Sequence, residues 1–322
     1  MFRKRNKDQK KLDTETDNDG IIILRKTPPG VCGGTDATLD TRAPKTITSS
    51  EMTFFSATSS FDPVTRPDDS ENSGSIGYIS AFAAPAGEGA FLFLETAGGF
   101  GGHGETKEAW AFLEDKDGIF PSLTELVKES GIASKNGFHS RTHGLPEDFG
   151  GSVLIRYDGG EKISFSDNQC PVLNQDSAVR IKNLFERAMT GKKRILPLTS
   201  DLREIRFSET RDGGEYTNAV LSLNPDGTGE NKKRSKYEGT GVFENSKPVD
   251  RETVNLIKHN IDRTGILAWA GLPDREYAPL RKKSITFVFS NGISTTVTAG
   301  KEVPIQIEKA FFNIELELTV KH

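Results

Sequence analysis

The sequence predicts an α+β protein in which two tandem copies of an antiparallel β-meander sheet each pack against one or two helices. First, residues 122–171 and 254–304 carry the same order of helix, Gly-Leu-Pro tripeptide, strand, turn, strand and proline. Second, the strand-like segments are short and separated by turn-rich stretches, which is typical of a meander. Third, 322 residues correspond to about two domains of roughly 150 residues each. We therefore expect one repeat at residues 46–190 and another at residues 198–322.

The chain opens with residues 1–45, where we expect a disordered tail and an irregular lead-in. Six basic residues and one acidic residue occupy positions 1–11, and acidic residues follow them. Blocks of opposite charge with few apolar side chains remain hydrated. A Pro-Pro-Gly sequence at residues 28–30 breaks any regular element. The apolar run Ile21–Leu24 leaves open a short strand at the edge of a sheet.

Charge and targeting features bear on where the protein resides and on which partners it binds. An export signal has about 7–15 apolar residues after its basic start, and here acidic residues follow instead. We expect a cytoplasmic protein with no transmembrane segment; the alternative is an exported protein with an unannotated leader. The formal charge of −4 argues against nucleic acid as the partner. Cys32 and Cys170 are too few for a disulfide framework, and the sequence leaves their redox state open.

The first repeat begins with predicted strands and continues with a helix, a hairpin and a second helix. The first helix should begin at Pro121 and end at Gly131, because apolar residues between them share one helical face. Lys107–Glu114 fits a strand and a short helix equally well. The other expected elements are strands at Met52–Ala57, Ile76–Ala83 and Ala90–Glu95, a hairpin of Ser152–Tyr157 with Lys162–Ser166, and a helix from its cap Asp176 to Met189.

The second repeat shows the clearest turn signal in the chain. Asn291-Gly292 lies between two alternating apolar runs, which is the strongest short-range indication of a hairpin. Residues 307–320 fit a helix and a strand equally well. The other expected elements are strands at Leu202–Thr210 and Tyr216–Leu223, a polar strand ending near Tyr237, a helix from Asp250, and hairpin strands at Ile285–Phe289 and Thr295–Thr298.

Two stretches of the chain resemble an uncharacterised family of proteins from anaerobic gut bacteria. The stretch GLPEDFGGSVLIRYDGGEKISFSDN at residues 144–168, followed by a proline and a helix, carries the resemblance, and LRKTPPGVCGGTDA at residues 24–37 is similar as well. The resemblance covers most of the first repeat. It covers the second repeat more loosely, because the Ser-Asp-Asn tripeptide is missing there. It implies a tandem α+β repeat fold, and it implies no activity, cofactor or catalytic residue.

Motifs that could carry chemistry are weak. Gly99–Gly104 matches the dinucleotide-binding pattern G-x-G-x-x-G, but hairpins precede it in place of a βαβ unit, so we expect a glycine-rich turn. His139 and His143 have the spacing of two metal ligands on a helix, yet glycines on both sides favour a loop and no third ligand is evident. The basic run at residues 232–236 fits a solvated edge strand. We expect no catalytic residue, metal or cofactor.

The two Gly-Leu-Pro tripeptides and their neighbours, which we call the elbows, are the expected interaction surface. Binding residues concentrate in loops on a rigid scaffold, although core positions would suit the aromatic residues here equally well. We expect a non-catalytic protein that binds a protein or a small ligand. The alternative is a hydrolase-like enzyme with a site in the cleft between the repeats. The candidate residues are Phe138, His139, His143 and Phe149 at the first elbow, and Trp269 and Tyr277 at the second.

Overall fold

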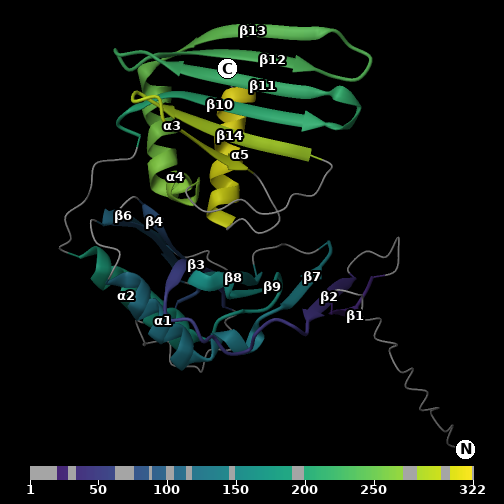
Figure 1. Ribbon diagram of the computed structural model, residues 1–322, viewed down its shortest axis with the longest axis vertical. Helices are drawn as coiled ribbons and strands as arrows, with labels where there is room; N and C mark the ends of the chain where they lie inside the picture. Colours follow the sequence, from purple (N-terminus) through teal and green to yellow (C-terminus); the bar gives the residue numbers. More distant parts are fainter. Residues whose placement is uncertain are drawn as a thin grey trace, which may run out of the picture.

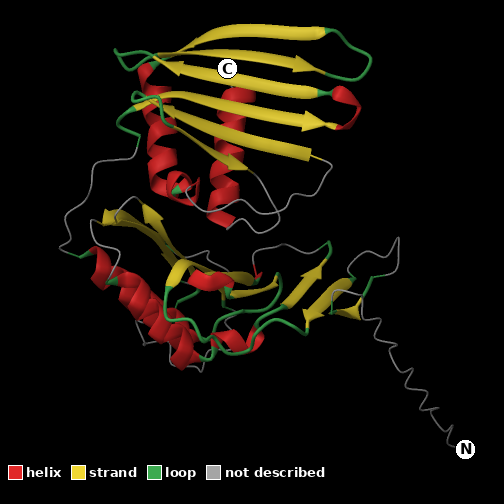
Figure 2. Cartoon of the chain, viewed as in Figure 1, coloured by secondary structure: helices red, strands yellow, loops and turns green. Residues whose placement is uncertain are grey.

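The chain folds into two antiparallel-rich sheets with a small number of helices, which confirms the predicted α+β class (Figures 1 and 2). One sheet has nine strands and the other has six. The computed structural model describes residues 20–27, 34–61, 76–86, 89–98, 105–113, 118–144, 149–190, 199–270, 281–298 and 305–320. We call the described residues up to 190 the first unit and those from 199 the second unit.

The nine-stranded sheet belongs to the first unit and has the order β1-β2-β7-β9-β8-β3-β4-β5-β6. Neighbouring strands are antiparallel, apart from β7 and β9, which are parallel and pair at two positions. The strands are β1 (Ile21–Arg25), β2 (Thr35–Asp40), β3 (Met52–Ser60), β4 (Tyr78–Ala86), β5 (Gly89–Ala97), β6 (Thr106–Leu113), β7 (Phe138–Thr142), β8 (Gly151–Tyr157) and β9 (Lys162–Asp167).

The six-stranded sheet belongs to the second unit and has the order β13-β12-β11-β10-β14-β15, with every neighbouring pair antiparallel. Its strands are β10 (Leu202–Arg211), β11 (Tyr216–Leu223), β12 (Gly229–Lys236), β13 (Val242–Val249), β14 (Arg281–Phe289) and β15 (Ser294–Thr298). The hairpin predicted at Asn291-Gly292 joins β14 and β15, and Gly292 supplies the left-handed backbone that this turn requires, with a φ of 81°.

The helices are α1 (Ile119–Ser130), α2 (Gln175–Met189), α3 (Arg251–Thr264), α4 (Ile266–Ala270) and α5 (Ile305–Thr319), with short 3₁₀ turns at Ile132–Lys135, Asp158–Gly160 and Asp212–Gly214. As predicted, α1 ends at Gly131 and α3 begins after Asp250, whose carboxylate accepts a hydrogen bond from the Thr253 N–H. The cap of α2 is Asn174 and not Asp176, because the Asn174 side chain accepts from the Ser177 N–H. Within the described residues, no helix has the length and apolar character needed to cross a membrane.

The layers alternate helix, sheet, helix, sheet (Figure 1). Helices α1 and α2 cover one face of the nine-stranded sheet. Helices α3, α4 and α5 pack under the six-stranded sheet, and they also rest on the second face of the nine-stranded sheet, where α4 contacts β4. One apolar core therefore lies within the first unit, and a second is shared by both units.

This layering explains the different sequence patterns of the two sheets. Strands β3, β4 and β5 are buried on both faces, so they read as nearly continuous runs of apolar and small residues. Strands β10 and β11 have one buried and one more accessible face, so buried side chains alternate with more accessible ones. The nine-stranded sheet lies inside the molecule over part of its area, whereas the six-stranded sheet forms an outer layer.

The two units connect their central strands in the same order. In the first unit, the order along the chain is four strands (β3–β6), helix α1, the additional strand β7, two strands (β8 and β9) and helix α2. Apart from β7, these strands lie side by side as β9-β8-β3-β4-β5-β6. In the second unit, four strands (β10–β13), helices α3 and α4, two strands (β14 and β15) and helix α5 give β15-β14-β10-β11-β12-β13. Gly131 and Gly265 end the corresponding helices α1 and α3, both with a left-handed backbone.

Several expectations need correction or completion. The lead-in is not irregular throughout: β1 and β2 extend the nine-stranded sheet beyond β7, and the edge strand left open at Ile21–Leu24 is present. The segment holding His139 is strand β7, not a loop. Strand β12 is not an edge strand, because the unpredicted β13 lies outside it. Of the two ambiguous segments, the first is strand β6 and the last is helix α5.

Candidate functional site

The structure describes the side chains of four of the six candidate residues. Phe138 is half-buried and His139 is exposed in β7; His143 is exposed just after β7, and Phe149 is half-buried before β8. Trp269 belongs to α4, but its side chain lies outside the described residues, as does Tyr277. The tripeptides of both elbows, apart from Gly144, also lie outside them.

The two histidines bind different partners. The Nδ1 atom of His139 lies 3.0 Å from the Ser166 hydroxyl oxygen in β9. The Nε2 atom of His143 lies 2.9 Å from a carboxylate oxygen of Asp36 in β2. The spacing of four residues therefore does not bring the imidazoles to one metal, because β7 is a strand and each ring pairs with a neighbouring strand.

The Asp36 carboxylate is held from two sides. Its other oxygen accepts a hydrogen bond of 2.7 Å from the Thr27 backbone N–H. This N–H and, next, the His143 ring lower the pKa of Asp36 from 3.8 to about 2, since both favour the ionised form. The contact links the start of β2 to the residue just after β7, beside the first elbow.

These side chains share one face of the nine-stranded sheet, which we call the polar face and define by Asp36, His139, Arg141, His143 and Ser166. The register pairs Asp36 with Arg141 and His139 with Ser166, so their side chains lie on the same side. His139, Arg141 and His143 are exposed. Strands β1, β2 and β7 extend beyond the helices of the second unit in Figure 1.

Further across the same sheet face, the surface is aromatic and buried. Phe82 lies 5.2 Å from Phe54 and 5.9 Å from Phe91 between ring centroids, and Phe91 lies 5.0 Å from Phe112. These rings belong to the core shared with α3 and α4. Burial of each ring contributes about 1.5–3 kcal/mol. An exposed aromatic patch would have favoured a binding role, but these rings hold the two units together.

A charged cluster borders the aromatic region. Glu95 in β5 and Glu108 in β6 are directly opposed across the strand pair. Arg263 of α3 forms an ion pair of 2.5 Å with Glu108. Burial, together with the negative charge of Glu108, raises the pKa of Glu95, while Lys309 of α5 and Arg263 oppose this shift. We call Glu95, Glu108, Arg263 and Lys309 the seam cluster, because it draws on both units.

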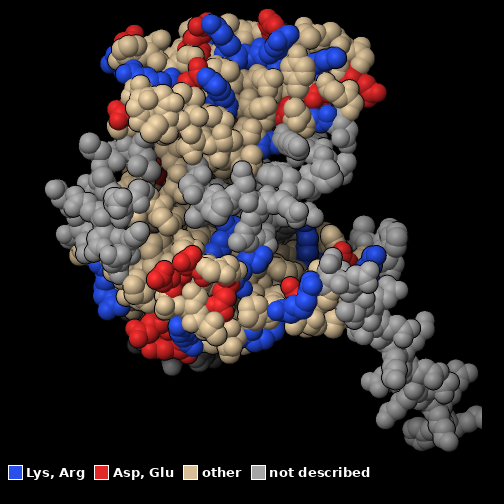
Figure 3. Space-filling view, viewed as in Figure 1, with Lys and Arg blue, Asp and Glu red and all other residues tan. Residues whose placement is uncertain are grey.

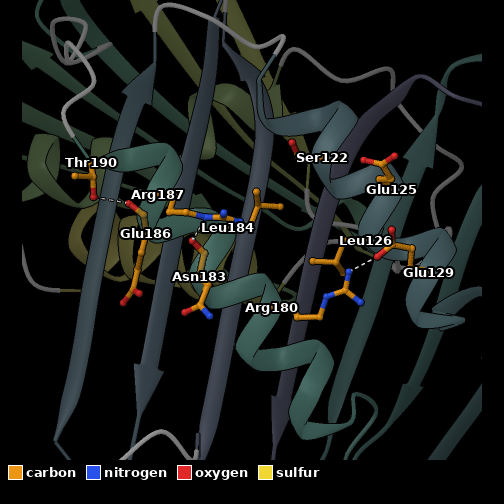
Figure 4. A pocket seen from close by; sticks show the side chains of 10 residues that line it. All are labelled: Ser122, Glu125, Leu126, Glu129, Arg180, Asn183, Leu184, Glu186, Arg187 and Thr190. Carbon is orange, nitrogen blue, oxygen red and sulfur yellow. Dashed lines mark hydrogen bonds and ion pairs between the residues drawn. The ribbon is translucent and has the colours of Figure 1, made fainter.

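A groove of about 670 Å³ lies between α1 and α2, away from the second unit (Figure 4). Figure 4 shows the Arg180 guanidinium reaching from α2 to its ion-pair partner Glu129 on α1. The polar residues that line the groove are Glu125, Glu129, Glu186, Arg180, Arg187, Asn183, Ser122 and Thr190. Lys182 next to the groove pairs with Glu186 at 2.8 Å. Much of this charge is therefore already compensated within the helix pair.

The outer face of the six-stranded sheet carries charges of both signs (Figure 3). Lys232 pairs with Glu230 at 3.2 Å, and Arg234 pairs with Glu244 at 3.0 Å. The basic run seen in the sequence is thus interleaved with acidic partners, and exposed pairs of this kind contribute about 0–1 kcal/mol each.

No protein-family model matches the chain, and no match was found among curated proteins. Within the residues that the structure describes, no group of three or more His, Cys, Asp or Glu side chains is placed to hold a metal ion. Cys170 is exposed, and partial desolvation of its thiol, together with the nearby Asp167 carboxylate, raises its pKa. The Gly99–Gly104 motif lies outside the described residues.

The sequence identified the histidines but not their surroundings. Asp36 lies in the lead-in and Arg141 carries no motif, so neither stood out without knowing that β2 adds to β7. Ser166 was noted only as the end of a strand. Strict alternation on β9 was the available signal, because Ser164 and Ser166 alternate with the buried Ile163 and Phe165.

Proposed function

We propose that the protein is a non-catalytic binding protein built from a duplicated sheet module. The matching order of the central strands in the two units, interrupted only by β7 in the first, supports a duplication, as does the matching glycine at the ends of α1 and α3. Binding is favoured over catalysis because, in the part of the chain that the structure describes, the polar side chains are spread over surfaces and paired locally, and do not converge on a deep pocket.

The polar face carries this proposal. It combines an exposed guanidinium, two exposed imidazoles and a fixed carboxylate on rigid strands, next to the part of the sheet that the second unit covers. Arg and His side chains donate hydrogen bonds to carboxylates and phosphates. The ligand we propose is a protein segment or small molecule that presents an anionic group to Arg141 and the histidines. Phe138 alternates with His139 along β7, so its side chain points to the opposite face of the sheet and lies outside this surface.

Removal of a charge on the polar face tests the proposal. We expect Arg141→Gln, which avoids a second carboxylate opposite Asp36, to reduce quantitative affinity capture of a partner at least tenfold while the protein stays folded. The matched control is Arg187→Gln in the groove between α1 and α2, which should capture the partner normally. Direct titration of the captured partner against both variants then separates binding from indirect effects. Equal loss in both variants would contradict a role for the polar face.

The second elbow is a separate part of the proposal. Trp269→Ala should weaken the same capture while the protein stays folded. Unfolding of the second unit by this substitution, at a cost of about 3–5 kcal/mol typical of a large buried aromatic residue, would place Trp269 in the core instead.

A hydrolase-like enzyme with a site between the units is the second candidate. The observation that favours it is the seam cluster, where one carboxyl group with a raised pKa faces another that is paired with an arginine. Such pairs can divide the roles of general acid and base. A panel of chromogenic ester, phosphate and glycoside substrates tests it. Turnover that is lost in both Glu95→Gln and Glu108→Gln would favour the enzyme over the binding protein.

A further inference from the structure

Strand β13 forms a long outer edge of the six-stranded sheet. It has eight residues, pairs with β12 without a register shift, and is exposed along its length apart from Val249. Figure 1 shows no described element beside its outer edge. An edge strand presents a row of backbone N–H and C=O groups to any strand that approaches it.

The register shows which backbone groups point outward. The Asn224 N–H donates to the Thr228 carbonyl, and this pair continues the β11–β12 ladder. Hydrogen-bonded and non-hydrogen-bonded pairs alternate in an antiparallel ladder. Even-numbered residues of β12 therefore bond to β11, and odd-numbered residues bond to β13. In the β12–β13 pair, the odd-numbered residues of β12 lie opposite Phe243, Asn245 and Lys247, so the backbone groups of these three residues bond to β12. The backbone N–H and C=O groups of the even-numbered residues of β13 therefore point outward.

Pro248 fits this assignment. A proline lacks the N–H group and is tolerated in a strand where that group would point to solvent. Beyond Pro248, the outward groups at Val242, Glu244 and Ser246 are not blocked by a bulge or another proline. Large apolar side chains gather at the other end of the strand, around Val242: Tyr237, Val242 and Phe243 are 40%, 46% and 57% exposed.

We propose that β13 pairs antiparallel with β13 of a second copy of the chain, about a two-fold axis at Asn245. In this register Glu244 lies opposite Ser246 of the other copy, and these residues can exchange both backbone hydrogen bonds. Val242 lies opposite Pro248 and donates to its carbonyl. Phe243 lies opposite Lys247, whose alkyl chain can cover the exposed ring. The two sheets then form one continuous sheet with closed two-fold symmetry.

The alternative symmetric registers fit less well. A shift by one residue would set outward groups against residues that are already bonded to β12, so the axis must move in steps that keep even residues opposite even residues. An axis at Glu244 would place two glutamates directly opposite each other, which is destabilising. An axis at Ser246 would place Glu244 opposite Pro248 and Val242 opposite Asp250, which lies beyond the end of β13, so fewer outward N–H groups would find a partner within the strand than with the axis at Asn245.

A second copy is the favoured partner for β13 because the strands at the corresponding edges of the first unit are paired or partly covered within the chain. The edge of β9, which corresponds to the short β15, is extended by β7, β2 and β1. The edge strand β6, which corresponds to β13, has a buried second half and a ring contact of 6.2 Å from Trp110 to His259 of the second unit. Strand β13 has an uninterrupted ladder and a self-complementary order of side chains.

A cysteine at the proposed axis tests the register. In a chain with Cys32→Ser and Cys170→Ser, Asn245→Cys would face itself in a non-hydrogen-bonded pair, where Cα atoms lie about 4.5 Å apart and a disulfide can form. We expect a covalent dimer on mild oxidation, read on a non-reducing gel. The matched control Lys247→Cys, which would lie opposite Phe243, should not cross-link. A failure of Asn245→Cys to cross-link, or equal cross-linking of both variants, overturns the proposal.

A proline pair tests the edge itself in the full chain. Ser246→Pro removes an outward N–H and one side-chain hydrogen bond, to Glu230. The control Thr296→Pro does the same on the edge strand β15, where the lost side-chain bond is to Thr286. Light scattering coupled to size exclusion should report a dimer for the wild type and Thr296→Pro, and a monomer for Ser246→Pro. A monomeric wild type, or a dimer that Ser246→Pro leaves intact, contradicts the proposal, whether or not the polar face binds a ligand.

Discussion

Gly265 at the end of α3 lies against the ring of Phe91 in β5, so closely that a Cβ atom on Gly265 would sit 2.1 Å from a ring carbon of Phe91. This is a direct contact between the two units, at the centre of their shared core. The backbone of Gly265 is also left-handed, with a φ of 69°. Two separate constraints therefore exclude a side chain at this position.

The first prediction concerns this contact. Gly265→Ala should lower the free energy of unfolding by about 2–5 kcal/mol, combining roughly 1–2 kcal/mol for the left-handed backbone with about 1–3 kcal/mol for overpacking against Phe91. Chemical denaturation measures the loss. The control is Gly131→Ala, which has a φ of 66° but open space around it, so only the backbone cost is expected. Equal losses in both variants would show that the units do not press together here.

The second prediction concerns pH and Asp36. The folded pKa lies below the unfolded one, so the contribution to stability is full above about pH 4 and is lost as the pH falls toward 2. Asp36→Asn should therefore be less stable than the wild type at neutral pH and equal to it below about pH 2. Thermal midpoints across this range measure the difference. The variant His143→Ala should raise the Asp36 pKa only part of the way, because the Thr27 N–H bond remains.

The third prediction has the opposite sign and concerns Glu95. Its folded pKa is raised by burial and by Glu108, so the wild type loses stability as the pH rises above the ordinary value of 4.5. Glu95→Gln should be more stable than the wild type at pH 7, and this advantage should shrink as the pH falls from 7 and be gone at about pH 4.5. Glu108→Gln breaks the ion pair with Arg263 and should bring no such gain. A Glu95→Gln variant with no advantage at pH 7 would contradict the burial of this carboxylate.

The fourth prediction concerns Asn136, a buried polar side chain beside α1. Its amide group donates to the carbonyls of Pro44 and Lys162, and its oxygen accepts from the Ser164 N–H. Asn136→Ala leaves these groups unsatisfied and should destabilise the protein by about 2–4 kcal/mol, as judged from roughly 1 kcal/mol for each bond and the cost of stranded partners. Hydrogen exchange should rise at Ser164. A loss below about 1 kcal/mol would mean that water replaces the amide.

Local signals predicted the parts of the fold that local chemistry determines. Asn291-Gly292 located a hairpin, Gly131 the end of a helix, and Asp250 the start of another. Strand β13 was missed because Val242–Val249 is exposed on both faces and contains a proline, so it has no alternation to detect. Helix α5 stayed ambiguous because Ile314, Leu316 and Leu318 alternate with acidic residues as in a strand, while Ile307, Phe311, Ile314 and Leu318 also follow a helical spacing.

The candidate site was predicted in part for the same reason. Histidine is an uncommon residue in this chain and attracted notice wherever it occurred. Its partners Asp36 and Ser166 are ordinary polar residues whose importance depends on pairings between distant strands. Sequence spacing carries no information about such pairings, since β2 reaches β7 across about a hundred residues of intervening chain.

The alternation of helix and sheet layers has a consequence for how large such a protein can grow. Each unit offers a helical side and a sheet side, so stacking is head to tail and in principle could continue, as it does in solenoids. The phenylalanine-bearing sheet accepts a following unit, whereas Arg206, Asn218 and Lys232 face outward on the last sheet. The second unit thus resembles a terminal cap. To add a third unit, one would have to replace those outward residues with aromatic ones. The added unit would also need a glycine, like Gly265, where its helix packs against the new rings.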